Sequence, residues 1–419
     1  MERFGSTYYT RLVGGRKIIM SAEPEVARHV LQKNHRNYEK SELQTESLGQ
    51  YVGQGLLTSN GAFWLRQRRL IQPGFHRERL EGLLQIMNDE INQYKTELAQ
   101  RLENGSLKVD LAAEMMQLTL RVVSRALFST GISQEQLSFL NESFTILQRH
   151  IIKEVRQPVF NWIRRINGKK RRALSLSGQV RELMKDIIMS RKRMKEEDMP
   201  DDLLTMLLST RYEDSGEPMS MTQLLDELLI IFVAGHETTA NSLTWTFYLL
   251  SQDKAYIEKV RSESERVFEK ALSLDSLSVA MFSQQSINES LRLYPPAWII
   301  DRKPLKADQV GSLKISAGDL VGIYVYGIHR EKSLWPHPHE FRPERFRDMP
   351  SSSLFTFFPF GGGPRLCIGN HFAMMEMQLV VLQLWSAFDF TYLEKDKPAL
   401  EPLITLRPKG GMPMKVSLA

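Results

Sequence analysis

The spacing of hydrophobic residues divides the chain into a long helical middle and shorter strand-like regions. Between Trp64 and about Ser290, apolar residues recur three and four positions apart, as at Leu83, Ile86 and Ile91, which is the period of an amphipathic helix. From Pro295 to Tyr326 the pattern changes to β-branched runs between turn residues, which predicts strands. The chain is therefore expected to be mostly α with a smaller β region. The β-rich parts are expected at about 1–40, 296–326 and 388–419, and the helix-rich parts at about 41–295 and 367–387.

Particular elements follow from the same pattern. Alternation at Tyr8–Leu12 and Lys17–Met20 predicts a strand pair. Pro24 is expected to begin a helix that runs to about Lys33, with Ser21 as its cap, and a last helix is expected from Cys367 to about Ala387. No repeat, low-complexity segment or long linker divides the sequence, so residues 1–419 are expected to form a single domain.

Composition is that of a globular protein, with 419 residues of which 42% are hydrophobic and 25% are charged. The apolar stretch Leu228–Gly235 is far shorter than the roughly 20 residues that a membrane-crossing helix needs. The first residues resemble neither a signal peptide nor an anchor. These observations predict a cytoplasmic protein without a membrane span, although a chain that had lost an N-terminal anchor would have the same sequence.

The net charge of +6 comes from one segment. Between Arg149 and Arg172 there are nine basic residues and one acidic residue, Glu154, so this window contributes +8 and the rest of the chain about −2. No nucleic-acid recognition motif or aromatic stacking platform accompanies the segment. A solvated surface is the favoured interpretation, and no nucleic-acid partner is expected.

The chain has a single cysteine, Cys367. One cysteine excludes an intramolecular disulfide and a multi-cysteine zinc site. Cys367 follows the Gly361–Pro364 turn and stands where the last helix is expected to begin, a position that favours the thiolate form. A thiolate can ligate haem iron. Arg365, two residues earlier, would face a nearby negative charge such as a haem propionate.

The residues around this cysteine resemble the ligand loop of the cytochrome P450 superfamily. The loop pattern Phe-x-x-Gly-x-Arg-x-Cys-x-Gly is met at Phe360, Gly363, Arg365, Cys367 and Gly369. The resemblance, closest to the soluble bacterial type, implies the P450 fold: a helical prism with a long central oxygen-binding helix. It also implies haem b, held between that helix and the cysteine-ligand helix, with Cys367 as the axial ligand of the iron.

A second family motif lies earlier in the chain. Glu289 and Arg292 are three residues apart, a helical spacing at which opposite charges meet. The Pro343–Phe346 run follows downstream and supplies Arg345. The resemblance implies that Glu289, Arg292 and Arg345 form an internal ion-pair trio that locks the coil carrying the cysteine loop.

Further residues match the family's propionate-binding positions. Trp64 and Arg68 are four residues apart and share one helical face, where an indole N–H and a guanidinium could hold one carboxylate. The alternative for this pair is an ordinary amphipathic helix with a buried tryptophan. Arg302 resembles the family's additional propionate-binding arginine. With Arg365 it would neutralise the two carboxylates.

The helix around Ala234 matches the family's oxygen-activating motif. Ile231, Ala234 and Thr238 share a face at the 3.6-residue period, and the small residues leave room for dioxygen. The resemblance implies that Glu237 and Thr238 are the acid–alcohol pair that delivers protons. His236 lies about 100° from this face and is not expected to act.

The expected substrate pocket is largely apolar, which does not identify a substrate. By family position its residues are Ile231, Ala234, Trp298, Ile299, Ile300 and Ile404.

The resemblance implies a monooxygenase that inserts one atom of O₂ into an organic substrate, by C–H hydroxylation or oxidative O-demethylation. Electrons from NAD(P)H would come through a separate ferredoxin and its reductase, or through a flavin reductase. Arg66, Arg69, Arg77 and Arg79 are expected to steer this acidic partner to a monomeric enzyme. The alternatives are a peroxide-using or isomerising haem-thiolate enzyme, against which the intact Glu237–Thr238 pair argues, and a non-catalytic haem sensor.

Overall fold

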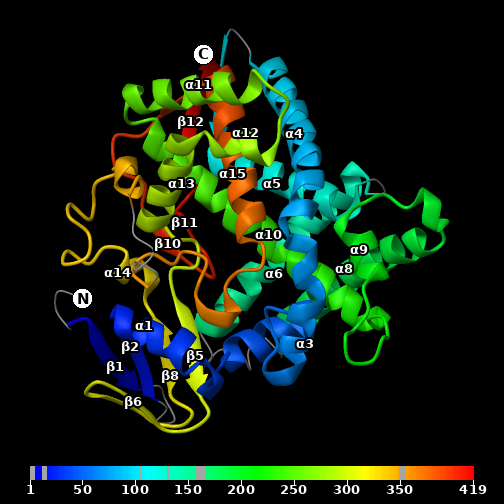
Figure 1. Ribbon diagram of the computed structural model, residues 1–419, viewed down its shortest axis with the longest axis vertical. Coiled ribbons are helices and arrows are strands. Elements are labelled where there is room, and N and C mark those ends of the chain that lie inside the picture. The colour runs from blue at the N-terminus through cyan, green and yellow to red at the C-terminus, as the bar shows by residue number, and fades with distance from the viewer. Residues whose placement is uncertain (1–4, 12–16, 103–104, 130–131, 157–166, 349–354) are drawn as a thin grey trace. The chain divides into compact units, whose positions relative to one another are not determined.

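The computed structural model describes residues 5–11, 17–102, 105–129, 132–156, 167–348 and 355–419. Within these residues helices predominate and the strands form small sheets (Figure 1), so the prediction of a mostly α fold with a smaller β part is confirmed. Part of the basic window, residues 157–166, lies outside the described residues. No helix in the described ranges combines the length and the apolar character needed to cross a bilayer.

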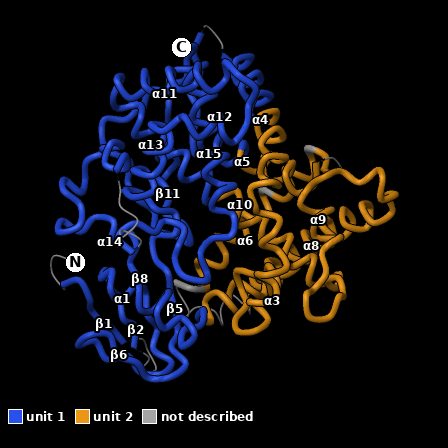
Figure 2. Tube along the Cα trace, viewed as in Figure 1, with its two compact units in different colours: residues 1–41, 91–118, 238–419 blue, residues 42–90, 119–237 orange. Residues whose placement is uncertain are grey.

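The chain divides into two compact units, each made of segments that are distant in the sequence (Figure 2). Unit 1 contains residues 1–41, 91–118 and 238–419, and unit 2 contains residues 42–90 and 119–237. The boundary at 237/238 falls inside one long helix, α10 (Met221–Leu250). That the whole chain is one catalytic domain stays a prediction.

Unit 1 contains a five-stranded sheet beside the N-terminus, in the order β1-β2-β8-β5-β3 (Figure 1). The strand pair expected at the start of the chain forms, because β1 and β2 are antiparallel, whereas β2 and β8 are parallel. Residues 12–16 between them lie outside the described residues. The strands are β1 (Thr7–Arg11), β2 (Lys17–Ser21), β3 (Tyr38–Glu39), β5 (Ile300–Pro304) and β8 (Leu320–Ile323), with a separate hairpin of β6 (Asp308–Val310) and β7 (Leu313–Ile315).

The core of this part of unit 1 joins the sheet to the short helices after β2. Val30 and Leu31 pack with Val321, Ile323 and the aromatic rings that precede the cysteine loop. The short helices and turns after β2 are α1 (Pro24–Arg28), a π-helix η1 (His29–Lys33) and a 3₁₀ turn η2 (His35–Asn37). Later in the chain, unit 1 adds α14 (Val325–Ile328) and a 3₁₀ turn η8 (Pro343–Phe346).

The rest of unit 1 packs helices against a second sheet of order β4-β12-β9, whose strand β4 lies inside the region predicted to be helical. The apolar helix α15 (Asn370–Ala387) is buried from Met375 to Trp385. The other elements are α11 (Lys254–Phe268), α12 (Leu274–Ser278), α13 (Met281–Leu293), β4 (Ser106–Asp110), β9 (Phe388–Tyr392), β10 (Leu400–Pro402), β11 (Leu406–Pro408) and β12 (Pro413–Leu418).

Unit 2 is helical. Its helices bury apolar faces at the predicted spacing; on α3, for example, Trp64, Leu70 and Ile71 are buried. The elements are η3 (Leu43–Leu48), α2 (Gly49–Val52), α3 (Gly61–Ile71), η4 (Gln72–Phe75), α6 (Gln134–Arg156), α8 (Lys169–Lys192), η7 (Glu196–Asp198) and α9 (Leu203–Ser209). Three helices have residues in both units: α4 (Arg77–Gln100), α5 (Leu111–Phe128) and α10.

The helix expected from Pro24 begins at that residue, but its predicted cap and the predicted start of the last helix are wrong. Ser21 does not cap α1: it is the last residue of β2, and Glu23 is the residue before the helix. The last helix begins at Asn370 and not at Cys367, because its first helical hydrogen bond runs from the Ala373 N–H to the Gly369 carbonyl. Cys367 therefore precedes the helix by one turn.

Candidate active site

The cysteine loop is a tight turn that folds back on itself. The Cys367 N–H donates to the carbonyl of Phe360 at 3.0 Å, across a 3₁₀ turn, η10 (Gly363–Arg365). Gly361 and Gly363 have φ angles of +77° and +67°, which an L-residue with a side chain rarely adopts. The cysteine itself is exposed. The loop thus presents a thiol from a backbone held by hydrogen bonds.

Two arginines in unit 1 lie close enough to repel each other. Arg302, on β5, is 7% exposed and donates to the Asp301 carbonyl at 2.7 Å. Burial and the neighbouring charge of Arg302 lower the pKa of Arg365 to about 10, while Glu39 acts in the opposite sense. Burial likewise lowers the pKa of Arg302, against the effect of Asp301. Two desolvated guanidiniums beside an exposed cysteine fit a ligand that carries carboxylates, as haem does.

After its first turn, helix α10 is buried except for one short stretch. From Leu224 to Leu250 the residues that retain appreciable exposure are Ile231, Val233, Ala234, Gly235 and Thr238. Ala234 is the most open of them, and the predicted face of Ile231, Ala234 and Thr238 is included. His236 is buried, its Nδ1 lies 2.8 Å from the Phe232 carbonyl, and burial lowers its pKa. An open patch with small residues at Ala234 and Gly235, on a helix that is otherwise mostly buried, can accommodate a small ligand.

Glu237 and Thr238 stand next to each other on α10 but have different environments. The Glu237 carboxylate is buried and accepts a hydrogen bond from the Gln148 amide on α6, within unit 2. Thr238, in unit 1, is partly exposed, and its carbonyl accepts the Ser242 hydroxyl at 2.8 Å. Sequence reasoning missed Gln148, because a polar residue on an amphipathic helix carries no signal of a partner 89 positions away.

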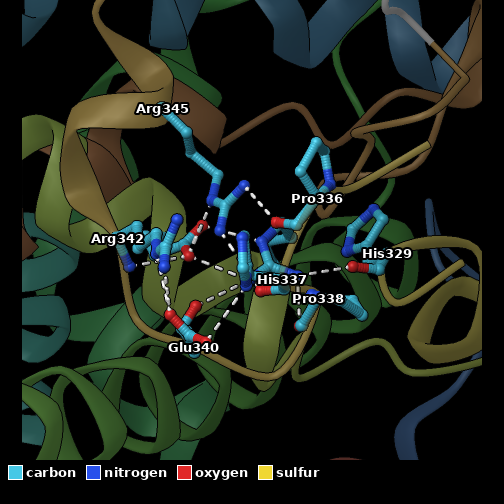
Figure 3. Close-up of polar contacts among 9 residues, drawn as sticks. His329, Pro336, His337, Pro338, Glu340, Arg342 and Arg345 are labelled. Carbon is cyan, nitrogen blue, oxygen red and sulfur yellow. Dashed lines mark hydrogen bonds and ion pairs between the residues drawn. The ribbon is translucent and has the colours of Figure 1, made fainter. Parts of the chain in front are cut away.

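The ion-pair trio is assembled in unit 1. Glu289 on α13 contacts Arg292 at 2.7 Å and Arg345 at 2.9 Å, and its side chain is fully buried. Arg292 also donates to the carbonyls of His329 and Pro338, and Arg345 to those of two coil residues (Figure 3). The guanidiniums therefore tie the helix to the coil between 329 and 345.

His329 extends this network toward the cysteine loop. Its Nε2 accepts the Phe358 N–H at 3.1 Å, two residues before the loop begins at Phe360. Burial, with the charges of Arg292 and Arg330, lowers the pKa of His329 to about 3. A neutral imidazole is required for this acceptor role. The histidine is thus a structural link between the trio and the loop.

The remaining predicted site residues are divided between the units. Trp64 is buried on α3 in unit 2, and Arg68 on the same helix donates to Gln72 at 3.3 Å. In unit 1, the Trp298 indole N–H donates to the Leu403 carbonyl at 3.1 Å, and Ile404 beside it is 45% exposed.

Two more apolar residues lie near the loop and the sheet. The Ile300 Cδ1 lies 3.8 Å from where a Cβ on Gly361 would stand, and Ile299 packs in the same way against Gly322. Ile300 therefore lies against the cysteine loop, and its place in a substrate pocket stays a prediction.

Comparison with known proteins identifies the class of this site. The sequence profile described as cytochrome P450 matches residues 1–414. A cytokinin hydroxylase of Arabidopsis thaliana is 36% identical, over 93% of this chain and 77% of its own length. An echinocystic acid 23-monooxygenase of Saponaria officinalis is 30% identical, over 94% and 79%. The crystal structure of a cytochrome P450DA haem domain superposes with a TM-score of 0.86 at 21% identity, over 99% and 90%.

A haem-binding oxygenase is the class of protein that these findings define. The chain belongs to the cytochrome P450 family. The predicted fold is confirmed, and so is the predicted activity, that of a haem-thiolate monooxygenase which incorporates oxygen from O₂ into an organic substrate with electrons from a redox partner. The peroxide-using, isomerising and sensor alternatives are not favoured. Cytoplasmic localisation stays a prediction.

Proposed function

We propose that Cys367 is the axial ligand of haem b and that the enzyme hydroxylates a C–H bond of an apolar organic substrate. The observation that carries the proposal is the exposed position of the chain's one cysteine, in a loop held by the Phe360 carbonyl. Haem ligated by a thiolate supplies the chemistry that activates dioxygen. The hydroxylase and monooxygenase names of the relatives favour hydroxylation over O-demethylation.

The haem propionates are proposed to bind Arg302 and Arg365, and their carboxylates would relieve the repulsion between the two guanidiniums. The family motif also assigns Arg68 and the indole N–H of Trp64 to propionate binding. Phe360 and Gly369 are proposed to shape the loop on either side of the ligand.

Proton delivery is proposed for Glu237 and Thr238. A buried carboxylate next to a partly exposed threonine suits the transfer of a proton from the interior to the open face of α10. Gln148 would hold the carboxylate in place by its hydrogen bond. Ala234 and Ile231 would leave space on this face for dioxygen and for the substrate.

The electron donor is proposed to be a separate ferredoxin or flavin reductase acting on a monomeric enzyme. Of the four arginines expected to steer it, two already have acidic partners in unit 2: Arg66 pairs with Asp214 at 2.8 Å, and Arg79 pairs with Asp201. Arg69 is exposed on the same helix as Arg66. The steering charge should therefore come more from Arg69 than from Arg66.

Spectroscopy tests the ligand and turnover tests the relay. The reduced wild-type protein should bind carbon monoxide with the red-shifted Soret band of thiolate ligation, and Cys367→Ser should lose that band while keeping its helical circular dichroism. Thr238→Ala should keep the band but consume NAD(P)H and oxygen with less product. A wild-type protein that retains no haem, or a Cys367→Ser variant that keeps the band, would overturn the ligand assignment. Unchanged coupling in Thr238→Ala would overturn the relay.

A further inference from the structure

The carboxylate of Asp308, at the start of the β6–β7 hairpin, collects hydrogen bonds from one short segment of the chain. Its Oδ2 accepts from Asn34 Nδ2 at 2.9 Å and from the Tyr38 hydroxyl at 2.8 Å, and lies 2.8 Å from His29 Nε2. Its Oδ1 accepts the Gln309 backbone N–H at 2.8 Å. The hairpin thereby holds residues 29–38, which are more than 260 positions earlier in the sequence.

The segment held by Asp308 lies directly against the cysteine loop. A Cβ on Gly363 would stand 1.9 Å from the carbonyl oxygen of Leu31 and 3.2 Å from the Cα of Gln32. Leu31 belongs to the π-helix η1, a conformation that is rare and is often found at functional sites. The turn of the loop therefore packs directly against the backbone of η1.

A second point of the same segment acts on the loop through charge. Glu39 follows Tyr38 directly and favours the charged form of Arg365, against the effects of burial and of Arg302. Strand β3 fixes this position, because Tyr38 pairs with Pro304 and Glu39 with Lys303 on β5. One residue before η2, Leu31, thus packs on the loop, and one after it, Glu39, acts on the charge of the loop's arginine.

The interior beneath these contacts is continuous. Leu31 and Tyr38 belong to the same buried apolar cluster as Phe355 and Phe358. A Cβ on Gly362 would meet the Phe355 ring at 2.7 Å. A shift of the segment would therefore be passed to the loop, because close-packed interiors transmit strain.

We propose that Asp308 is a positioning residue for the haem ligand. Its hydrogen bonds to His29, Asn34 and Tyr38 keep η1 against Gly363 and so hold Cys367 in its ligating position. The inference rests on the proposed ligation by Cys367. Asp308 itself touches neither the loop nor the cofactor, so it acts through the backbone of η1.

The test compares Asp308→Asn with a matched control, Glu114→Gln. Glu114 is also a carboxylate in unit 1 that accepts a tyrosine hydroxyl, from Tyr94 at 2.6 Å, together with the Arg101 guanidinium, but it lies on α5 and belongs to a different network. Each haem-loaded protein is reduced and saturated with carbon monoxide. The decay of the red-shifted Soret band is then followed in mild urea, while circular dichroism monitors helix content.

In Asp308→Asn the red-shifted Soret band should decay about tenfold faster than in wild type, with helix content unchanged. The reason is that losing a charge-assisted hydrogen bond changes an opening equilibrium by roughly that factor. Tyr38→Phe, which removes one donor and keeps the ring, should have a smaller effect in the same direction. Glu114→Gln should convert at the wild-type rate.

Equal conversion rates in Asp308→Asn and Glu114→Gln would overturn the inference, as would a wild-type rate in both Asp308→Asn and Tyr38→Phe. Hydrogen exchange of the holoprotein gives a second reading: peptides covering 29–34 and 360–367 should both lose protection in Asp308→Asn and not in the control. Protection lost only in the first peptide would also overturn it. A wild-type protein without the red-shifted band would instead contradict the proposed ligation.

Discussion

Replacing Glu289 with glutamine should strongly destabilise unit 1. The Glu289 carboxylate accepts from Arg292 Nε and Nη2 at 2.7 and 2.8 Å, from Arg345 Nε at 2.9 Å and from the Arg342 N–H at 2.9 Å. The side chains of Glu289 and Arg292 have no exposed surface. Glutamine has nearly the same shape but carries no charge, so the variant would leave two guanidiniums with no compensating anion in the trio.

The magnitude follows from the burial of the pair. Breaking a buried ion pair by removing one partner costs about 3–5 kcal/mol, which is a large part of the roughly 5–15 kcal/mol that stabilises a typical protein. With an unfolding entropy of about 2.1 cal/mol/K per residue, a loss of about 4 kcal/mol lowers the melting temperature of a chain this long by roughly 4–5 °C.

The assay is urea and thermal unfolding followed by circular dichroism, with Glu401→Gln as the control. Glu401 pairs with Arg407 at 2.9 Å, but the two side chains are 35% and 26% exposed. A surface pair of this kind contributes about 0–1 kcal/mol. A Glu289→Gln variant as stable as Glu401→Gln would refute the view that the trio holds the coil before the cysteine loop.

Three further predictions concern other parts of the chain. Burial acts to raise the pKa of Asp308, but its hydrogen bonds lower this pKa to about 2. The charged carboxylate should stabilise the fold fully above the unfolded pKa of about 3.9, so the difference in unfolding free energy between wild type and Asp308→Asn should narrow as the pH falls from about 5 to about 2. A difference independent of pH would contradict this. Thr405→Val removes the acceptor of the 3.1 Å hydrogen bond from the buried Asn241 amide, so the free energy of unfolding should fall by about 1–3 kcal/mol. A wild-type free energy in urea unfolding would contradict this. Arg69→Gln should slow reduction by the electron donor at low salt more than Arg66→Gln, because Arg66 is already paired, and stopped-flow rates that rank the other way would contradict this.

The sequence was most informative where chemistry depends on a short spacing. One cysteine in the run from Phe360 to Gly369 was enough to indicate a thiolate ligand, because few other roles need that arrangement of glycine, arginine and cysteine. The helical period likewise predicted the open face of α10 at Ala234. It could not locate the first residue of α15, because whether Cys367 enters the helix depends on its hydrogen bond to Phe360, seven positions away.

Long-range partners were decided by the tertiary structure alone. Nothing in the sequence distinguishes Gln148 from other polar residues of α6, yet it contacts Glu237. The same is true of Asp308 and His29, which look like ordinary surface residues. Strand β4 was missed for a related reason: it is paired by β12 at the other end of the chain, and a few residues of weak local preference take the conformation that their partner imposes.

The sequence by itself thus determined the class of chemistry, the residue types at the site and the course of the long helices, since these depend on local spacing and periodicity. Only the tertiary structure decided which distant residues support the cysteine loop. The physical reason is that hydrogen bonds and packing between remote segments depend on the whole folded chain, and their partners leave no periodic trace in the sequence.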